Sequence, residues 1–254
     1  MKNKLKSLGL AIGTLVALFN LQTSSASAEE YPFTKFQTED RRYEETFSQE
    51  TNATSSVKTE VITEEFSKDR YINNAPPITK KLIQSKDPNV KLSEQEMEQF
   101  LKELDSGVAR NIYNVYDDWN TLTPAEKSLA KTNPWVAARV KICKDIAWNI
   151  TGSRYGQGYN DWRDAFRHGL WNAVMVRDVG PNWAKKWADA HETIAGQPAI
   201  EKQMDLFNNA VGRTLSKYGS SANNTTIANN VKKYIDQHKF KRISRDKRSL
   251  VWTP

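Results

Sequence analysis

The chain has 254 residues, and its 37 lysines and arginines against 30 aspartates and glutamates give a net charge of +7. This length suits one domain of ordinary size with additional segments, and 38% hydrophobic residues suffice for a core. The single cysteine, Cys143, excludes an intramolecular disulfide, so the fold must be stabilised by packing. Cys143 lies among apolar positions of a predicted helix, and we expect it to be buried there.

The first 28 residues have the pattern of a signal peptide. Three lysines within the first six residues precede an apolar run over residues 8–21, and Ala26-Ser27-Ala28 provides the small residues read by a signal peptidase. The apolar run is shorter than the roughly 20 residues that a transmembrane helix needs. We therefore predict a secreted or cell-surface protein with no transmembrane span after cleavage; an uncleaved membrane anchor is the alternative.

The charge is divided unevenly over the rest of the chain. Residues 29–75 hold 11 acidic and 6 basic side chains, a net charge of −5, and their apolar residues follow no period. Such a segment buries too little surface to offset chain entropy, so it is predicted to be disordered, either a pro-segment or a spacer. Residues 76–254 carry a net +9, since the first 28 residues contribute +3.

Many of the basic side chains lie near the C-terminus: Lys232, Lys233, Lys239, Lys241, Arg242, Arg245, Lys247 and Arg248. They predict an anionic partner, which could be phospholipid, an anionic wall polymer or nucleic acid. A solvated helix face without a partner is the alternative.

Capping signals and helix breakers predict a helical domain over residues 76–254. Ser93 with Glu96 forms a capping box, and Thr123-Pro124 starts a second helix. Further helices are expected over residues 134–149, 161–178, 181–192, 199–218 and 223–237, with a Gly-rich loop over 151–159 and a short strand over 249–252. The predicted fold class is all-α: a compact multi-helix domain with one short C-terminal strand, preceded by a disordered segment.

The helix expected over residues 161–178 combines an apolar surface on nearly every side with two polar residues. Asp164 and His168 stand four positions apart and therefore share a helix face. A helix that is apolar all round lies centrally in its domain. Buried polar groups without partners cost roughly 2–7 kcal/mol, so both side chains are expected to be paired or to bind a metal.

The two following helices add more polar groups at the edge of an apolar stripe. The first of them ends in His191 and Glu192, and the second has Asp205, Asn208, Asn209 and Arg213 beside its core-facing stripe. Gly212 in this second helix costs about 1 kcal/mol relative to alanine, and we expect it to allow a close helix approach.

These groups predict a site at the meeting point of three helices. Asp164, His168, His191 and Asp205 could bind a divalent metal such as zinc, which would activate water. Alternatively, His168 oriented by Asp164 acts as a general base without metal. A structural hydrogen-bond network is the third possibility. In the enzymatic hypotheses Asp164, His168, His191 and Glu192 are catalytic, while the substrate would be bound by Arg167, Asn208, Asn209 and Arg213.

Three ordered blocks resemble a family of bacterial domains of unknown function: Asp164-Ala-Phe-Arg-His168 with Trp171-Asn172-Ala173, then Ala190-His191-Glu192, then Met204-Asp205-Leu206 with Asn208-Asn209 and Gly212-Arg213. The resemblance covers about residues 120–215. It implies a helical, exported domain in which these polar residues form one site, and it implies no activity.

Two functions follow as hypotheses. The first is an exported hydrolase acting on an anionic phosphodiester or phospholipid-like substrate, with a toxin or bacteriocin as one biological setting. The second is a non-enzymatic cell-surface or wall-binding module, in which the basic C-terminal region binds an anionic polymer and the polar cluster is structural.

Overall fold

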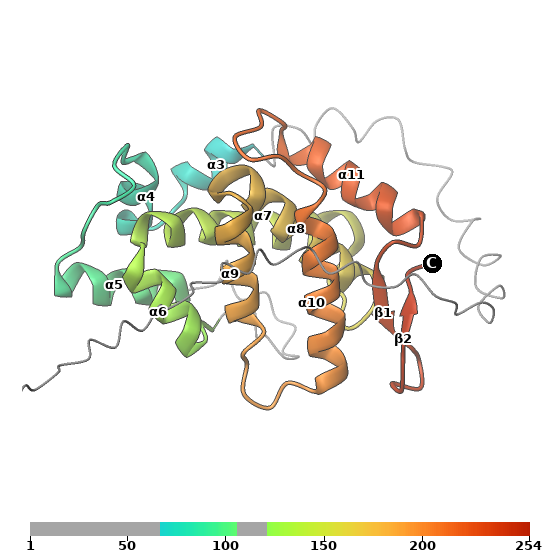
Figure 1. Ribbon diagram of the computed structural model, residues 1–254. Helices are drawn as coiled ribbons and strands as arrows, with labels where there is room; N and C mark the ends of the chain where they lie inside the picture. Colours follow the sequence, from blue (N-terminus) through green and yellow to red (C-terminus); the bar gives the residue numbers. More distant parts are fainter. Residues whose placement is uncertain (1–66, 106–120) are drawn as a thin grey trace, which may run out of the picture. The chain divides into compact units, whose positions relative to one another are not determined.

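The computed structural model describes residues 67–105 and 121–254, which lie within one compact unit. The predicted signal peptide and most of the acidic segment fall outside these residues. The described part contains nine helices and one small sheet, which confirms the all-α prediction (Figure 1). In chain order the elements are α3 (Lys68–Asn73), α4 (Pro77–Gln84), α5 (Glu94–Asp105), α6 (Pro124–Thr132), α7 (Pro134–Tyr155), α8 (Trp162–Val179), α9 (Pro181–His191), α10 (Ala199–Arg213), α11 (Asn224–Asp236), β1 (Lys241–Ile243) and β2 (Leu250–Trp252).

The helices begin where the sequence provides caps. Thr123 and Glu126 form a complete capping box at the start of α6, and Ser93 and Glu96 exchange the same pair of hydrogen bonds before α5. Asp161 caps α8 by accepting hydrogen bonds from two backbone amides of its first turn. These bonds satisfy N–H groups that a helix leaves without an internal partner.

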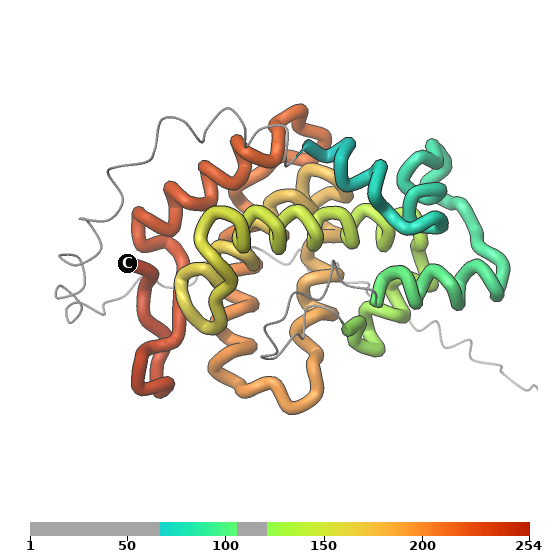
Figure 2. Tube along the Cα trace, turned by 180° about the vertical axis from the view of Figure 1, so that it is seen from behind, coloured from blue at the N-terminus to red at the C-terminus, as the bar shows by residue number. Residues whose placement is uncertain are grey.

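Helix α8 lies at the centre of the fold. It contacts α7, α9, α10 and α11, and every residue from Asp164 through Arg177 is buried. Viewed from behind, α7 runs across the group formed by α8, α9 and α10 (Figure 2). Among the described residues, none of the helices combines the length and apolarity required to cross a membrane.

Two glycines let α8 and α10 pack backbone against backbone. A Cβ placed on Gly212 of α10 would lie 2.7 Å from the Cα of Gly169 of α8 and would also collide with the Gly169 carbonyl oxygen. Close helix approach therefore accounts for Gly212, as the sequence predicted. The contact fixes the relative register of the two helices that carry most of the predicted polar residues.

Several predicted boundaries differ from the structure. Helix α7 continues to Tyr155, because Thr151 is buried and its hydroxyl donates to the Ala147 carbonyl, so only the end of the predicted 151–159 loop is irregular. Helix α10 ends at Arg213 rather than near residue 218.

Three elements were not anticipated: helices α3 and α4 and strand β1. Helix α3 lies inside the segment predicted to be disordered to residue 75, and Ser67 caps it while Tyr71 packs on the core. The predicted C-terminal strand pairs with the unpredicted strand β1 in antiparallel register, Lys241 opposite Trp252.

The glycine contact generates a stability prediction. Gly212→Ala should lower the free energy of unfolding by about 1–3 kcal/mol, because the added methyl group meets the backbone of α8 and forces the helices apart. Urea unfolding followed by circular dichroism measures the change. Gly152→Ala in α7 is the matched control, since its Cβ would meet only the end of the Gln157 side chain; a change there of no more than about 1 kcal/mol is expected. Equal effects of the two substitutions would contradict this account of Gly212.

Candidate metal centre

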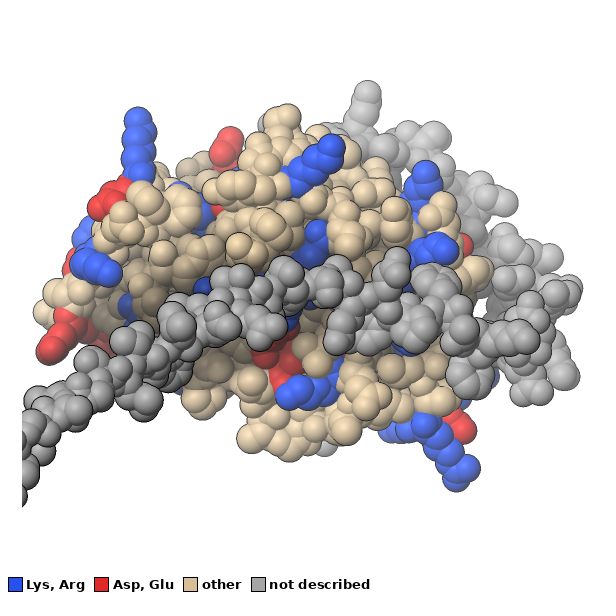
Figure 3. All heavy atoms as spheres, in the orientation of Figure 1, with Lys and Arg blue, Asp and Glu red and all other residues tan. Residues whose placement is uncertain are grey.

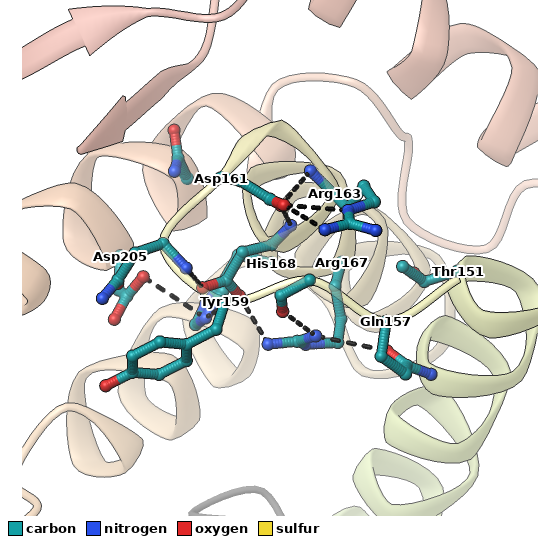
Figure 4. A network of polar contacts seen from close by, with 12 residues as sticks. Thr151, Gln157, Tyr159, Asp161, Arg163, Arg167, His168 and Asp205 are labelled. Atoms are coloured by element: carbon teal, nitrogen blue, oxygen red, sulfur yellow. Dashed lines mark hydrogen bonds and ion pairs between the residues drawn. The ribbon is translucent and has the colours of Figure 1, made fainter. Parts of the chain in front are cut away.

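Three ligand-type side chains converge between α8 and α10. The Nε2 atom of His168 lies 3.5 Å from Asp164 Oδ1 and 3.4 Å from Asp205 Oδ1. One ligand atom from each residue lies within 4.8 Å of the others, and all three residues are buried. Figure 4 shows His168, Arg167 and Asp205 beside the loop that carries Gln157 and Tyr159. The i, i+4 spacing on α8 supplies the first two residues, and the close approach of α10 supplies the third.

Asp205 has one carboxylate oxygen that is satisfied and one that is not. Its Oδ2 accepts a hydrogen bond from Gln197 Nε2 at 3.1 Å. Its Oδ1 is buried and accepts no hydrogen bond from the residues that the structure describes. Burial raises the pKa of Asp205 well above its usual range, and the charges of Glu192 and Asp164 add to this effect against the opposing charge of Arg167. A proton or a cation next to Oδ1 would remove the unfavourable burial of this charge.

Asp164 is held from both sides. Its Oδ1 accepts from Arg167 Nη2 at 2.5 Å, and its Oδ2 accepts from the backbone amide of Asn160 at 2.7 Å. Arg167 is only 4% exposed, donates also to the Gly158 carbonyl, and lies over the Trp148 ring. The arginine predicted to contact substrate is therefore paired with Asp164 and the loop before α8.

His168 presents its other nitrogen to a hydrogen-bonding group of α10. The Nδ1 atom lies 3.0 Å from Asn209 Oδ1 and 3.7 Å from Glu192 Oε1. Burial lowers the pKa of His168, and the opposing charges of Asp164 and Glu192 do not compensate. The ring is therefore neutral near neutral pH, which is the form that can bind a metal ion.

The second predicted imidazole belongs to a different cluster. His191 Nδ1 lies 3.0 Å from Glu126 Oε1, and its ring packs edge-to-face on Trp171. His191 is thus not part of the Asp164–His168–Asp205 group, so the structure assembles three members of the predicted four-ligand set. The physical reason is that α9 ends at His191: this side chain faces α6, while Glu192 in the next position reaches α10.

From sequence, Glu126 had no predicted role in the site; Thr123 and Pro124 marked only the start of a helix, where the structure shows a capping box. In the structure its Oε2 accepts the Thr123 amide of that box, and its Oε1 binds His191. Both acceptors belong to a side chain that is 2% exposed. The sequence around Glu126, Ala125 before it and Lys127 and Ser128 after it, has no pattern that would have indicated this second role.

Two predicted substrate-binding residues have clear structural partners. Asn208 donates to the Lys241 carbonyl and accepts from the Lys241 amide, and so joins strand β1 to α10. Arg213 is half-buried and donates to Asn172 Oδ1 at 3.0 Å. The sequence had not assigned Asn172, Gln197 or Asn160 to the site.

The matched region of the chain coincides with this site. Residues 127–239 match the model of a family described as a domain of unknown function (DUF6973). This range contains Asp164, His168, Asp205 and all of the other predicted site residues, and it agrees with the expectation of an uncharacterised domain family. No curated protein and no solved structure matches the chain.

The Glu126–His191 pair generates a pH-dependent prediction. Burial raises the pKa of Glu126, but the hydrogen bond and charge of His191 and the Thr123 amide outweigh it, so the net shift is downward. A carboxylate with a lowered pKa stabilises the fold above its ordinary pKa, and this contribution is lost as the pH falls through the folded-state value. Glu126→Gln should therefore cost about 1–3 kcal/mol at pH 7, and the deficit should shrink on acidification.

Urea unfolding at pH values from 7 down to 3 measures this deficit. Glu98→Gln is the control, because Glu98 makes only an exposed i, i+4 ion pair with Lys102. A Glu126→Gln deficit that stays constant over the whole pH range would show that the charge of Glu126 does not stabilise the fold.

Proposed function

We propose that this chain is an exported, metal-dependent hydrolase whose divalent ion is bound by Asp164, His168 and Asp205. The observation that carries the proposal is the Oδ1 atom of Asp205. It is buried, it accepts no hydrogen bond from the described residues, and it lies 3.4 Å from an imidazole nitrogen. A cation bound between these atoms and Asp164 Oδ1 would satisfy a charge that the protein otherwise leaves uncompensated.

The donor set suits a borderline or hard divalent ion. One imidazole nitrogen and two carboxylate oxygens are ligands typical of Zn²⁺, Mn²⁺ and Fe²⁺. Three protein ligands leave further coordination positions for water and substrate, which is the arrangement of catalytic rather than structural zinc sites. Such an ion lowers the pKa of a water that it binds and so supplies a nucleophile near neutral pH.

The surrounding residues would hold the ligands in place. Arg167 and the Asn160 amide fix Asp164, Gln197 bridges Asp205 and Glu192, and Asn209 fixes His168. In hydrolysis of an ester, the bond from the water oxygen forms as the ester bond breaks, and the proton released by the water passes to the departing oxygen. Glu192, predicted to be catalytic, lies on the Nδ1 side of His168 and is assigned to positioning.

The net charge of +9 over residues 76–254 supports an anionic substrate such as a phosphodiester or phospholipid. On the face shown in Figure 3, lysine and arginine side chains are scattered among acidic ones and do not gather in one patch. A toxin or bacteriocin is one setting for such an activity.

The alternative is a non-enzymatic surface or wall-binding module with a structural polar cluster. It is favoured by the burial of the three ligands, none of which is more than 7% exposed. The two functions differ in what Asp205 contributes to stability, and this difference can be measured.

The metal centre predicts a specific effect of Asp205→Asn. The wild type should bind one equivalent of Zn²⁺ or Mn²⁺, and an ion at 100 times its dissociation constant should stabilise the fold by about 2.7 kcal/mol. Asp205→Asn should lose this stabilisation, while the metal-free variant should be as stable as the metal-free wild type or more so, because a poorly compensated buried carboxylate has been removed.

Isothermal titration calorimetry, elemental analysis and thermal unfolding with and without chelator provide the readouts. Asp236→Asn removes the same charge from an exposed pair with Lys232 and should leave ion binding unchanged. If the wild type binds no ion and Asp205→Asn destabilises the metal-free fold, the cluster is structural and the proposal is wrong.

The hydrolase function is tested with two anionic substrates, bis(p-nitrophenyl) phosphate and vesicles containing phosphatidylglycerol. Hydrolysis of at least one is expected to require the added divalent ion and to fall by 100-fold or more in His168→Gln, because the ion loses its nitrogen ligand. His238→Asn is the control, since His238 has a φ of 55°, which asparagine tolerates, and lies outside the cluster. An ion-loaded protein that hydrolyses neither substrate would contradict the proposed substrate class.

A further inference from the structure

A line of side-chain amides connects Arg213 to His168. Arg213 Nη1 donates to Asn172 Oδ1 at 3.0 Å, and Asn172 Nδ2 donates to Asn209 Oδ1 at 2.7 Å. Asn209 Nδ2 in turn donates to Glu192 Oε1 at 2.9 Å. Both asparagines are fully buried, and neither is explained by packing of apolar surface.

The ends of this line determine the orientation of both amides. A guanidinium only donates hydrogen bonds, and an ionised carboxylate or a backbone carbonyl only accepts them. Asn172 must present its oxygen to Arg213, and it must present its nitrogen to the His168 carbonyl oxygen, 3.1 Å away. Asn209 must present its nitrogen to Glu192, which leaves its oxygen for Asn172 and His168. Rotating either amide by 180° would place acceptors against acceptors.

This orientation decides which nitrogen of His168 carries the proton. Nδ1 lies 3.0 Å from the Asn209 oxygen, a normal hydrogen-bond length, whereas the carboxylate oxygens nearest Nε2 lie 3.4 and 3.5 Å away, so Nδ1 is the nitrogen that donates. A neutral imidazole has one N–H, and the other nitrogen then has a lone pair. That nitrogen is Nε2, which faces Asp164 Oδ1 and Asp205 Oδ1.

We infer that Arg213, Asn172 and Asn209 are positioning residues that hold His168 as the Nδ1–H tautomer and so direct the Nε2 lone pair at the cation site. The inference rests on the proposed function for the cation, but the tautomer itself does not. Hydrogen bonds to the distal nitrogen generally fix the tautomer and ring orientation of histidine ligands, and losing them weakens metal binding by about 10- to 100-fold. Arg213 therefore acts on the metal centre through two intervening side chains.

Nitrogen NMR of the metal-free full chain, labelled with ¹⁵N at histidine, tests the tautomer directly. The chain has only three histidines, so the ring resonances can be assigned with His191→Gln and His238→Asn variants. At neutral pH, His168 is expected to show a protonated Nδ1 and a non-protonated Nε2. On addition of Zn²⁺, the Nε2 resonance should move while Nδ1 stays protonated. A proton on Nε2, with or without one on Nδ1, would overturn the inference.

Substitutions along the line test the positioning role. Asn172→Asp keeps an acceptor for Arg213 but can no longer donate to Asn209, so a population with Nε2 protonated should appear and Zn²⁺ affinity should fall by at least about tenfold. Arg213→Met should act in the same direction but less strongly, because the His168 carbonyl still orients Asn172. Arg213→Lys, which retains a donor, should restore the wild-type tautomer and affinity.

A matched pair elsewhere supplies the control. Arg154 donates to Asn229 Oδ1 at 2.8 Å on the exposed side of α7, and Arg154→Met should change neither the tautomer nor the affinity. If Zn²⁺ moves the Nε2 resonance but Asn172→Asp and Arg213→Met leave tautomer and affinity unchanged, the positioning role is wrong and the metal centre stands. If the tautomer is as expected and responds to these variants but no divalent ion binds, the proposed function fails and the positioning of His168 stands.

Discussion

The site depends on the absence of a side chain at Gly212. Because this residue of α10 touches the backbone of Gly169 in α8, the two helices lie closer than side chains would normally allow. Polar residues one turn apart on α8 then contact polar residues one turn apart on α10. His168 lies beside Asp205 and Asn209. Asn172, one turn further along α8, contacts Asn209 and Arg213. With a larger separation these short side chains would lie beyond hydrogen-bonding distance, and each buried group would lose its partner.

Close packing also explains why the cluster tolerates so many carboxylates. Asp164 is compensated by Arg167 and a backbone amide, and Glu192 by two side-chain amides. Asn160 comes from the loop before α8 and Gln197 from the segment between α9 and α10, whereas Arg167 and Asn209 lie on α8 and α10 themselves. Within this cluster, the buried oxygens without a hydrogen-bond donor among the described residues are Asp205 Oδ1 and the amide oxygen of Gln197, and of these two only Asp205 belongs to an ionisable group. The electrostatic cost of burial in this cluster falls mainly on the Asp205 carboxyl group, whose pKa is raised well above its usual range, and proteins commonly retain such a cost at a functional site.

The sequence predicted the components of the site better than their pairing. The four-residue spacing on α8 placed Asp164 and His168 together, and the polar stripe beside the core face of α10 identified Asp205 and Asn209, because both patterns depend only on helix periodicity. The partner of His191 could not be predicted in this way. Successive helical residues point about 100° apart, so whether His191 or Glu192 faces α10 depends on how α9 is rotated in the folded protein. Strand β1 was missed because three residues carry no readable alternation.

The two sides of the His168 ring differ in a way that supports the proposed metal centre over a structural network. On the Nδ1 side, donors and acceptors alternate without a gap from Arg213 through Asn172 and Asn209 to Glu192. A network that serves only stability would be expected to continue this alternation on the other side, because each unmatched buried group weakens the fold. On the Nε2 side, however, the lone pair of the ring faces two carboxylate oxygens, and all three groups are acceptors. What such an arrangement lacks is a proton on a carboxylate or a cation, and two carboxylates with one oriented imidazole are a ligand set by which proteins bind a divalent cation.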